Sequence, residues 1–298
     1  MKVAIFPASG KLGGSLAKHI CKLIPLHDLV LVSRSPSKLD SYRDAGVTVR
    51  TADYDDPSTL ESAFSGIDVL FLISYITFQH EHRSKAHKLA IDCARACGVT
   101  HIFYTSLAFA GNSDHSVAQV MQAHLDTEIY LAELASKGLY SEGFPIYTAF
   151  FNIKNPSNEI RIPHNGTGPG IAWAKIDELG EASALLLAQF YASPAEFQHK
   201  NQKLVLSGPR EWSLEETAQA LSRVVGKEVS IREVSVEEYI AQPVVESALS
   251  INGKKMAREW ATAFDAIRHG ATAVVTPFLK DILGREPEDF ETTIRGMV

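Results

Sequence analysis

Short apolar, β-rich runs alternate with helix-length amphipathic segments along the N-terminal part of the chain. The expected strands are residues 3–6, 29–33, 47–51, 68–74 and 102–105, and the expected helices between them are residues 12–24, 37–44, 58–64 and 82–97. Runs of consecutive apolar residues are typical of strands buried on both faces of a parallel sheet. Because parallel neighbours need a helical crossover, the alternation predicts a Rossmann-type α/β fold with a doubly wound parallel sheet.

The rhythm changes beyond Gln119. Here we expect a helix to residue 136, a stretch rich in Gly, Pro and Asn, helices from Asp177, at 213–225 and at 245–269, and strands at 203–206 and 229–234. Segments that follow a doubly wound sheet usually cover its open end. We therefore predict an NAD(P)-binding domain over residues 1–137 and a smaller α/β substrate region over 138–298, some of whose segments return to the sheet.

Composition argues against several kinds of partner. Lys and Arg total 29 against 35 Asp and Glu, a net charge of −6 with no basic run, so neither nucleic acid nor anionic lipid is expected. The longest apolar runs, 69–73 and 184–188, are far shorter than the roughly 20 residues of a membrane-spanning helix. Three scattered cysteines fit a reducing compartment. We expect a cytoplasmic protein that acts on a small molecule.

The turn after the first expected strand carries the main binding signal. The sequence from Pro7 to Gly14 reads PASGKLGG and runs directly into a helix. Glycine lets the backbone approach a pyrophosphate, and the free amides at a helix N-terminus point at its charge. This arrangement predicts a dinucleotide site, although a tight turn that only leads into a helix would have the same pattern.

The end of the second strand indicates which dinucleotide binds. About twenty residues past the glycine turn, an NAD site usually carries an acid for the ribose 2′-hydroxyl. Here the sequence is Val-Ser-Arg-Ser, with Arg34 at that place and Lys38 one helical turn later. Cationic donors suit a 2′-phosphate, so we predict NADP(H) as cofactor. A solvated surface arginine is the alternative for Arg34.

Five short motifs resemble one family when they are taken together. They are GKLG at 10–13, RSPSK at 34–38, ADY at 52–54, YTSL at 104–107 and GLYSE at 138–142. The chain resembles the NmrA-like, atypical short-chain dehydrogenase/reductase family, and within it the NAD(P)H:quinone oxidoreductase 2 branch and its fungal relatives. The resemblance implies a Rossmann fold that binds NADP.

The motifs also imply the cofactor contacts. The residues assigned to the cofactor are Ala8, Ser9, Gly10, Lys11, Leu12 and Gly13 at the pyrophosphate, Arg34 and Lys38 at the 2′-phosphate, Asp53 and Tyr54 at the adenine, Ser74 and Tyr75 after the fourth strand, Tyr140 and Ser141 at the nicotinamide, and Lys175 near the substrate region.

The chain departs from the family pattern at two places. Pro7 stands where the family has its first glycine, and it has a fixed φ and no amide hydrogen, so we expect cofactor binding to be weakened but not abolished. The family has a short apolar strand before the GLYSE match, whereas here Lys137 is followed directly by Gly138. Either the sixth strand is deleted, or the β-rich run 144–151 replaces it.

The usual acid–base pair of short-chain dehydrogenases is missing. That pair is a tyrosine four residues before a lysine, whose cation lowers the phenol pKa, and none of the nine tyrosines has a lysine at this offset. His124 matches the lysine position, and Glu128, one turn later, could orient its imidazole. We predict His124 as the proton donor, with simple packing in the helix as the alternative.

Other polar and sulfur-bearing clusters are assigned to structure. His80, His82 and His87 lack the i, i+4 spacing of a helical zinc motif, so we expect a solvated helix start and no metal. Cys93 and Cys97 share a helix face, which predicts a buried apolar stripe with Leu89, with a redox pair as the alternative.

Three functions remain open from the sequence. The first is an NADPH-dependent reductase of a quinone-like or conjugated carbonyl substrate, for which Tyr75, Phe78, Phe109 and Tyr140 could line a flat apolar pocket. Core packing is the alternative for each of these side chains. The second is an NADP-binding sensor without turnover that presents its C-terminal half to a protein partner. The third is a redox-neutral isomerase or dehydratase with His124 as base.

Overall fold

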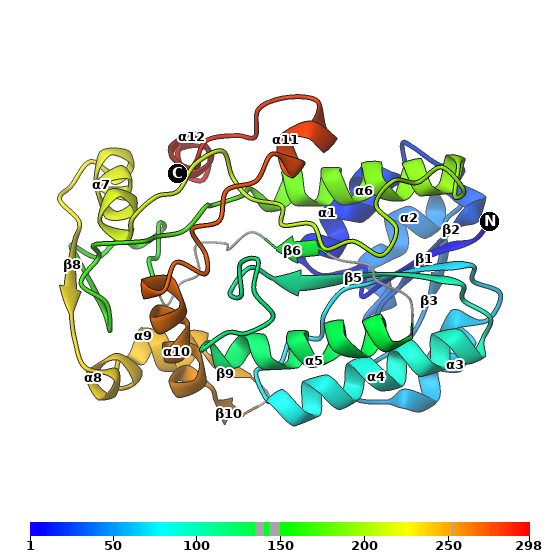
Figure 1. The fold of residues 1–298 in the computed structure, drawn as a ribbon, viewed down its shortest axis with the longest axis horizontal. Coiled ribbons are helices and arrows are strands. Elements are labelled where there is room, and N and C mark those ends of the chain that lie inside the picture. Colours follow the sequence, from blue (N-terminus) through cyan, green and yellow to red (C-terminus); the bar gives the residue numbers. More distant parts are fainter. Residues whose placement is uncertain (135–139, 143–149, 252) are drawn as a thin grey trace.

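A parallel sheet with helices on both faces forms the N-terminal part of the computed structural model (Figure 1), which describes residues 1–134, 140–142, 150–251 and 253–298. The sheet order is β3-β2-β1-β4-β5-β6. The strands are β1 (Val3–Phe6), β2 (Leu29–Val32), β3 (Thr48–Arg50), β4 (Val69–Leu72), β5 (His101–Leu107) and β6 (Tyr140–Glu142), and all neighbours pair in parallel. The strand order reverses between β1 and β4, which confirms the predicted doubly wound Rossmann-type sheet.

Alternate side chains of each central strand enter different cores. In β1, Val3 and Ile5 belong to the core on one face of the sheet, while Ala4 and Phe6 belong to the core on the opposite face. The flanking helices are α1 (Lys11–Ile20), α2 (Asp40–Asp44), α6 (Ile176–Ala192) and α11 (Phe278–Leu283) on one face, and α3 (Leu60–Phe64), α4 (His80–Ala96) and α5 (Gln119–Glu133) on the other (Figure 1). This double burial explains why the strands read as continuous apolar runs.

A second core lies beyond the carboxyl ends of the strands (Figure 1). It is built around Trp212, Tyr239, Trp260 and Phe264. Its elements are β7 (Glu159–Ile162), α7 (Leu214–Val225), β8 (Ser230–Glu233), α8 (Val236–Ile240), α9 (Pro243–Ala248), β9 (Ser250–Ile251), β10 (Lys254–Lys255), α10 (Ala257–Arg268) and α12 (Phe290–Arg295). Because α10 packs against α5, this region closes one end of the sheet. No helix among the described residues has the length and apolar content to cross a membrane.

The sixth strand of the sheet is formed by a segment that neither alternative named. Residues Tyr140–Glu142 form β6 and pair in parallel with Thr105–Leu107 of β5. The sixth strand is therefore present, but short, and it uses the GLYSE segment itself. The competing run 144–151 lies mostly outside the described residues, as does the predicted domain boundary at 137/138.

Two expected elements of the C-terminal half are wrong. The helix expected over 245–269 is divided into α9, the β9–β10 hairpin and α10. The sequence between β9 and β10 is Asn-Gly, a dipeptide typical of two-residue hairpins, and Gly253 has a φ of +77°. Residues 203–206 pair with none of the strands in the described part of the chain. Leu204 and Leu206 are buried in the core beside α1, so their apolar pattern reflects packing against that helix.

We predict that Gly13→Ala destabilises the fold while the neighbouring Gly14→Ala does not. A Cβ at Gly13 would lie 2.2 Å from the carbonyl oxygen of Pro7, whereas one at Gly14 would have its closest contact at 4.0 Å, with Ala8. The clash should cost about 2 to 4 kcal/mol of unfolding free energy, and Gly14→Ala should gain up to about 1 kcal/mol from helix propensity. Urea denaturation of both variants measures this, and equal stabilities would contradict it.

Candidate functional site

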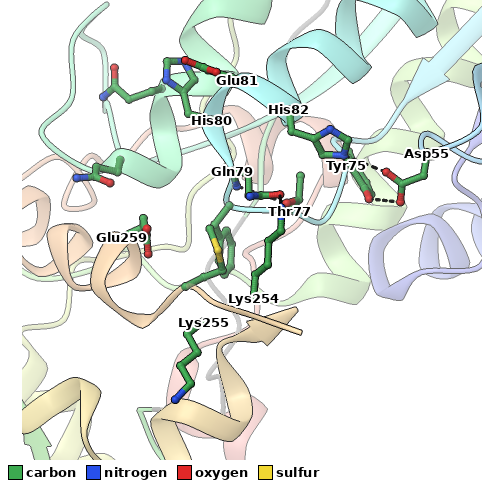
Figure 2. A pocket seen from close by; sticks show the side chains of 14 residues that line it. Asp55, Tyr75, Thr77, Gln79, His80, Glu81, His82, Lys254, Lys255 and Glu259 are labelled. Atoms are coloured by element: carbon green, nitrogen blue, oxygen red, sulfur yellow. Dashed lines mark hydrogen bonds and ion pairs between the residues drawn. The ribbon is translucent and has the colours of Figure 1, made fainter. Parts of the chain in front are cut away.

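A cavity of about 860 Å³ opens beside the carboxyl end of β4 (Figure 2). It lies between the β4–α4 connection, the starts of α4 and α5, and the β9–β10 hairpin. Its lining residues are Asp55, Tyr75, Thr77, Phe78, Gln79, His80, Glu81, His82, Gln119, Gln122, Lys254, Lys255, Met256 and Glu259. The volume is that of a site for a small organic ligand.

One end of the cavity is organised by Asp55. The hydroxyl of Tyr75 donates to Oδ2 of Asp55 at 2.5 Å, and Nε2 of His82 lies 2.9 Å from Oδ1 (Figure 2). The hydrogen bond from Tyr75 holds the pKa of Asp55 below its usual value. Burial, together with this carboxylate, raises the pKa of Tyr75. At neutral pH the pair is therefore a carboxylate with a protonated phenol as donor.

The middle of the cavity combines apolar side chains with a cation. The ring of Phe78 packs at 5.4 Å from Trp260, and Met256 is buried beneath the hairpin. Lys254 extends from the hairpin to the β4–α4 connection, where its Nζ donates to Oε1 of Gln79 at 2.8 Å (Figure 2). A flat aromatic ligand would find an apolar surface here and a donor at its edge.

The predicted phosphate turn is tied to the ends of β2 and β3. The backbone amide of Ala8 donates to Val32, and the hydroxyls of Ser9 and Ser33 lie 2.6 Å apart. The amide of Ala52 donates to Ser33, which brings the ADY segment alongside. Helix α1 then starts at Lys11, and its N-cap, Gly10, makes no side-chain cap. The first amides of α1 therefore remain available to an anion, and the absence of a Cβ at Gly13 keeps the turn close to the helix.

The cationic side chains at the end of β2 are free to meet a ligand. Arg34 and Lys38 are exposed, and neither forms an ion pair with another residue of the described ranges. Asp53 uses Oδ1 to accept from the amide of Asp55. Tyr54, in contrast, is 4% exposed, and its hydroxyl donates to the carbonyl of Ile73. Its ring belongs to the core below the predicted adenine site.

The remaining predicted cofactor residues lie farther along the strand edge. The hydroxyl of Ser74 accepts from Nε and Nη2 of Arg83 at 3.1 and 2.7 Å. Lys175 precedes α6 and pairs with Glu288 at 2.8 Å, so its charge is already compensated in part. For Tyr140 and Ser141 only the backbone, in β6, belongs to the described part of the chain.

His124 is completely buried and is not part of the cavity wall. Its Nδ1 lies 2.9 Å from the hydroxyl of Tyr104, and its Nε2 has no hydrogen-bond partner among the described residues. Burial lowers its pKa well below the usual histidine value. A role of His124 in proton transfer stays a prediction, and in this geometry it would act through Tyr104 without touching a ligand.

The expectation that Glu128 orients His124 is wrong. Glu128 accepts a hydrogen bond from Ser106 and pairs with Nζ of Lys203 at 2.8 Å. Lys203 comes from the segment after α6, which no spacing within α5 could predict. The stronger opposite charge draws the carboxylate away from the imidazole.

The histidines near the start of α4 divide into two groups. His80 and His82 are exposed, as expected for a helix start, but His87 is completely buried and hydrogen-bonded. No group of His, Cys, Asp or Glu within the described ranges could hold a metal ion. His87 lies on the buried stripe of α4 with Ala90 and Ile91, so helical spacing could have identified it.

Two further assignments of apolar residues need correction. Leu89 is 39% exposed, so it does not form the buried stripe expected with Cys93 and Cys97, which are only partly buried. Phe109 is buried in the second core and does not line the cavity. Tyr75 and Phe78 do line it. Sequence analysis also missed Asp55, whose partners come from elements far apart in the chain.

We predict that stability falls as pH drops below about 6.5, because burial lowers the folded-state pKa of His87 and His124. In this range the unfolded chain binds protons that the folded chain does not, so each histidine removes up to about 1.4 kcal/mol per pH unit. Urea unfolding at pH 7 and pH 5 should show a smaller loss for His124→Gln than for the wild type. Replacement of the exposed His115 by Gln should leave the loss unchanged. Equal losses of stability in the wild type and both variants would contradict the prediction.

Comparison with known proteins agrees with this architecture. The NmrA-like family model matches residues 1–290. The chain is 28% identical to the NmrA-like family domain-containing oxidoreductase flvB of Aspergillus flavus, over 100% of this chain and 95% of that protein. It is 29% identical to quinone oxidoreductase 2 of Escherichia coli over 80% of each.

Solved structures show the same likeness over the full length. The triphenylmethane reductase of Citrobacter sp., complexed with NADP(H), has a TM-score of 0.79 and 26% identity, covering 100% of both chains. The NADPH-dependent quinone oxidoreductase of Escherichia coli, complexed with NADPH, has a TM-score of 0.79 and 25% identity, covering 99% of both. Because the family model matches residues 1–290, nearly the whole chain, the protein belongs to the NmrA-like family.

Proposed function

We propose that this protein is an NADPH-dependent reductase of a quinone-like or other conjugated aromatic acceptor. The observation that carries the proposal is the cavity beside β4, which has Tyr75, Phe78 and Met256 in its wall. Strand β4 pairs with β1, and the phosphate turn follows β1. The relatives support the reaction class, since one is named an oxidoreductase, one a quinone oxidoreductase and one a triphenylmethane reductase.

The residues present fit a bound NADP(H). The uncapped start of α1 would receive the pyrophosphate, with Ser9 and Lys11 beside it. Arg34 and Lys38, exposed and without ion pairs in the described part of the chain, would hold the 2′-phosphate. Ser74 would border the ring that reacts. Two of the solved relatives are complexed with this cofactor.

When bound, the nicotinamide supplies the hydride, and the protein orients the acceptor. The apolar surface of Phe78 and Met256 would hold the plane of an aromatic acceptor against the cavity wall and exclude water from the face that contacts it. Orientation of this kind can account for much of a rate enhancement. Because His124 is buried, we assign direct protonation of the product to water in the open cavity, with Tyr104 and His124 as an internal hydrogen-bonded pair behind it.

A second candidate, an NADP-binding sensor without turnover, rests on the absence of a tyrosine with a lysine four residues later. The same phosphate turn and Arg34 would serve it, and the C-terminal region would meet a protein partner. A redox-neutral isomerase or dehydratase would need His124 as base, and its complete burial disfavours this role.

We expect Arg34→Ala to weaken NADPH binding about 10- to 100-fold, the value of a charge-assisted hydrogen bond to the 2′-phosphate. NADH binding should change little, because it has no such phosphate. Calorimetry with both nucleotides measures the difference, and Arg43→Ala provides a control because that arginine pairs with Asp40. Equal losses for NADPH and NADH would show that Arg34 does not read the phosphate.

We expect the protein to oxidise NADPH when it is given naphthoquinones, with Phe78→Ala raising KM more than it lowers kcat. The reason is that Phe78 provides binding surface and no chemistry. Steady-state assays over a panel of quinones and triphenylmethane dyes measure this. NADPH binding without oxidation of any acceptor would favour the sensor, and absence of NADPH binding would reject both.

A further inference from the structure

His87 joins α4 to the two residues that follow β4. Its completely buried imidazole places Nε2 at 2.9 Å from the backbone nitrogen of Tyr75 and 3.1 Å from Oγ of Ser74. A backbone N–H can only donate, so Nε2 must be the acceptor. The ring proton of the neutral imidazole therefore lies on Nδ1.

The opposite side of the ring agrees with this tautomer. Nδ1 lies 2.9 Å from Oγ1 of Thr127 in α5, and the Thr127 hydroxyl donates to the carbonyl of Ala123 at 2.6 Å. Thr127 thus accepts from Nδ1–H. Ser74 receives two hydrogen bonds from Arg83, which leaves its own hydroxyl proton to point at Nε2. The Tyr104 hydroxyl lies 3.3 Å from Nδ1 of this ring and 2.9 Å from Nδ1 of His124. Both nitrogens of the neutral ring therefore have partners among the described residues.

We propose that His87 is a positioning residue of the candidate active site. Its neutral imidazole holds the backbone at Ser74 and Tyr75 and so fixes the β4–α4 connection, the segment that supplies Tyr75, Thr77 and Phe78 to the cavity. The effect of His87 on turnover rests on the proposed function, whereas its hold on the β4–α4 connection does not.

The charges around the ring favour the same form. The groups that face it are Arg83 of α4, Tyr104 of β5, His124 of α5 and Tyr54 after β3. Burial first, and then the Arg83 cation, lower the pKa of His87 well below the usual value. A protonated ring would turn a second donor toward the Tyr75 amide, so the wall of the cavity has its shape only with a neutral His87.

Two substitutions of this one residue separate positioning from simple packing. In His87→Gln the carboxamide oxygen can occupy the place of Nε2 and accept from Tyr75, while His87→Asn ends near Nδ1 and reaches only Thr127. Both remove the ring. We expect the Tyr75 amide to exchange its hydrogen about 10-fold faster in His87→Asn than in His87→Gln, since only the Asn variant leaves that amide without an acceptor.

Kinetics provide the second measurement. We expect His87→Asn to raise KM for NADPH and for a naphthoquinone about 10-fold, with partial rescue by His87→Gln, because misplacement of the cavity wall weakens binding of both. Thr127→Val, which removes the partner on the far side of the ring, should lower the melting temperature but change KM by less than about 2-fold.

The outcomes distinguish this inference from the proposed function. Absence of NADPH binding by the wild type would reject the function, and exchange at Tyr75 would still decide the role of His87. Equal exchange rates in the Gln and Asn variants, or wild-type KM values in His87→Asn, would overturn the positioning role. If the Asn variant does not fold, a Tyr75 exchange rate in His87→Gln more than about 10-fold above wild type also overturns it.

Discussion

Parallel pairing of β1 with both β2 and β4 brings the ends of these strands to the same edge of the sheet. This constraint places the phosphate turn, Arg34 and Ser74 near one another although they are far apart in the chain. The strand order reverses between β1 and β4, which leaves a crevice at the carboxyl ends of these strands. The second core lies beyond these ends. The cavity lies where these two parts meet.

A buried hydrogen-bond network joins the helices and strands that carry the polar groups near this edge. His87 and Thr127 connect α4 to α5, and Tyr104 connects β5 to His124. Such networks are favourable only when almost every member is satisfied. Nε2 of His124 is an exception, a buried atom without a partner in the described part of the chain.

Much of this organisation could be predicted from local sequence. Consecutive apolar residues predicted the sheet, and five short motifs indicated the family, which the family model confirms over residues 1–290. The glycine turn and Arg34 predict the cofactor edge. These features depend on short stretches whose physical meaning does not change with context. The β9–β10 hairpin also has a local signal, the Asn-Gly dipeptide between its strands, which argues against the helix expected over 245–269.

The contacts that complete the site depended on tertiary structure. Asp55 meets Tyr75 and His82, Glu128 meets Lys203, and Lys254 meets Gln79, in each case across different elements. The sequence by itself determined which segments form the buried parallel strands and where a glycine turn leads into the first helix, because periodicity and turn chemistry are local. Only the folded chain decided which polar side chain is buried, which faces the cavity and which charge pairs with which, because those outcomes depend on packing between segments far apart in the sequence.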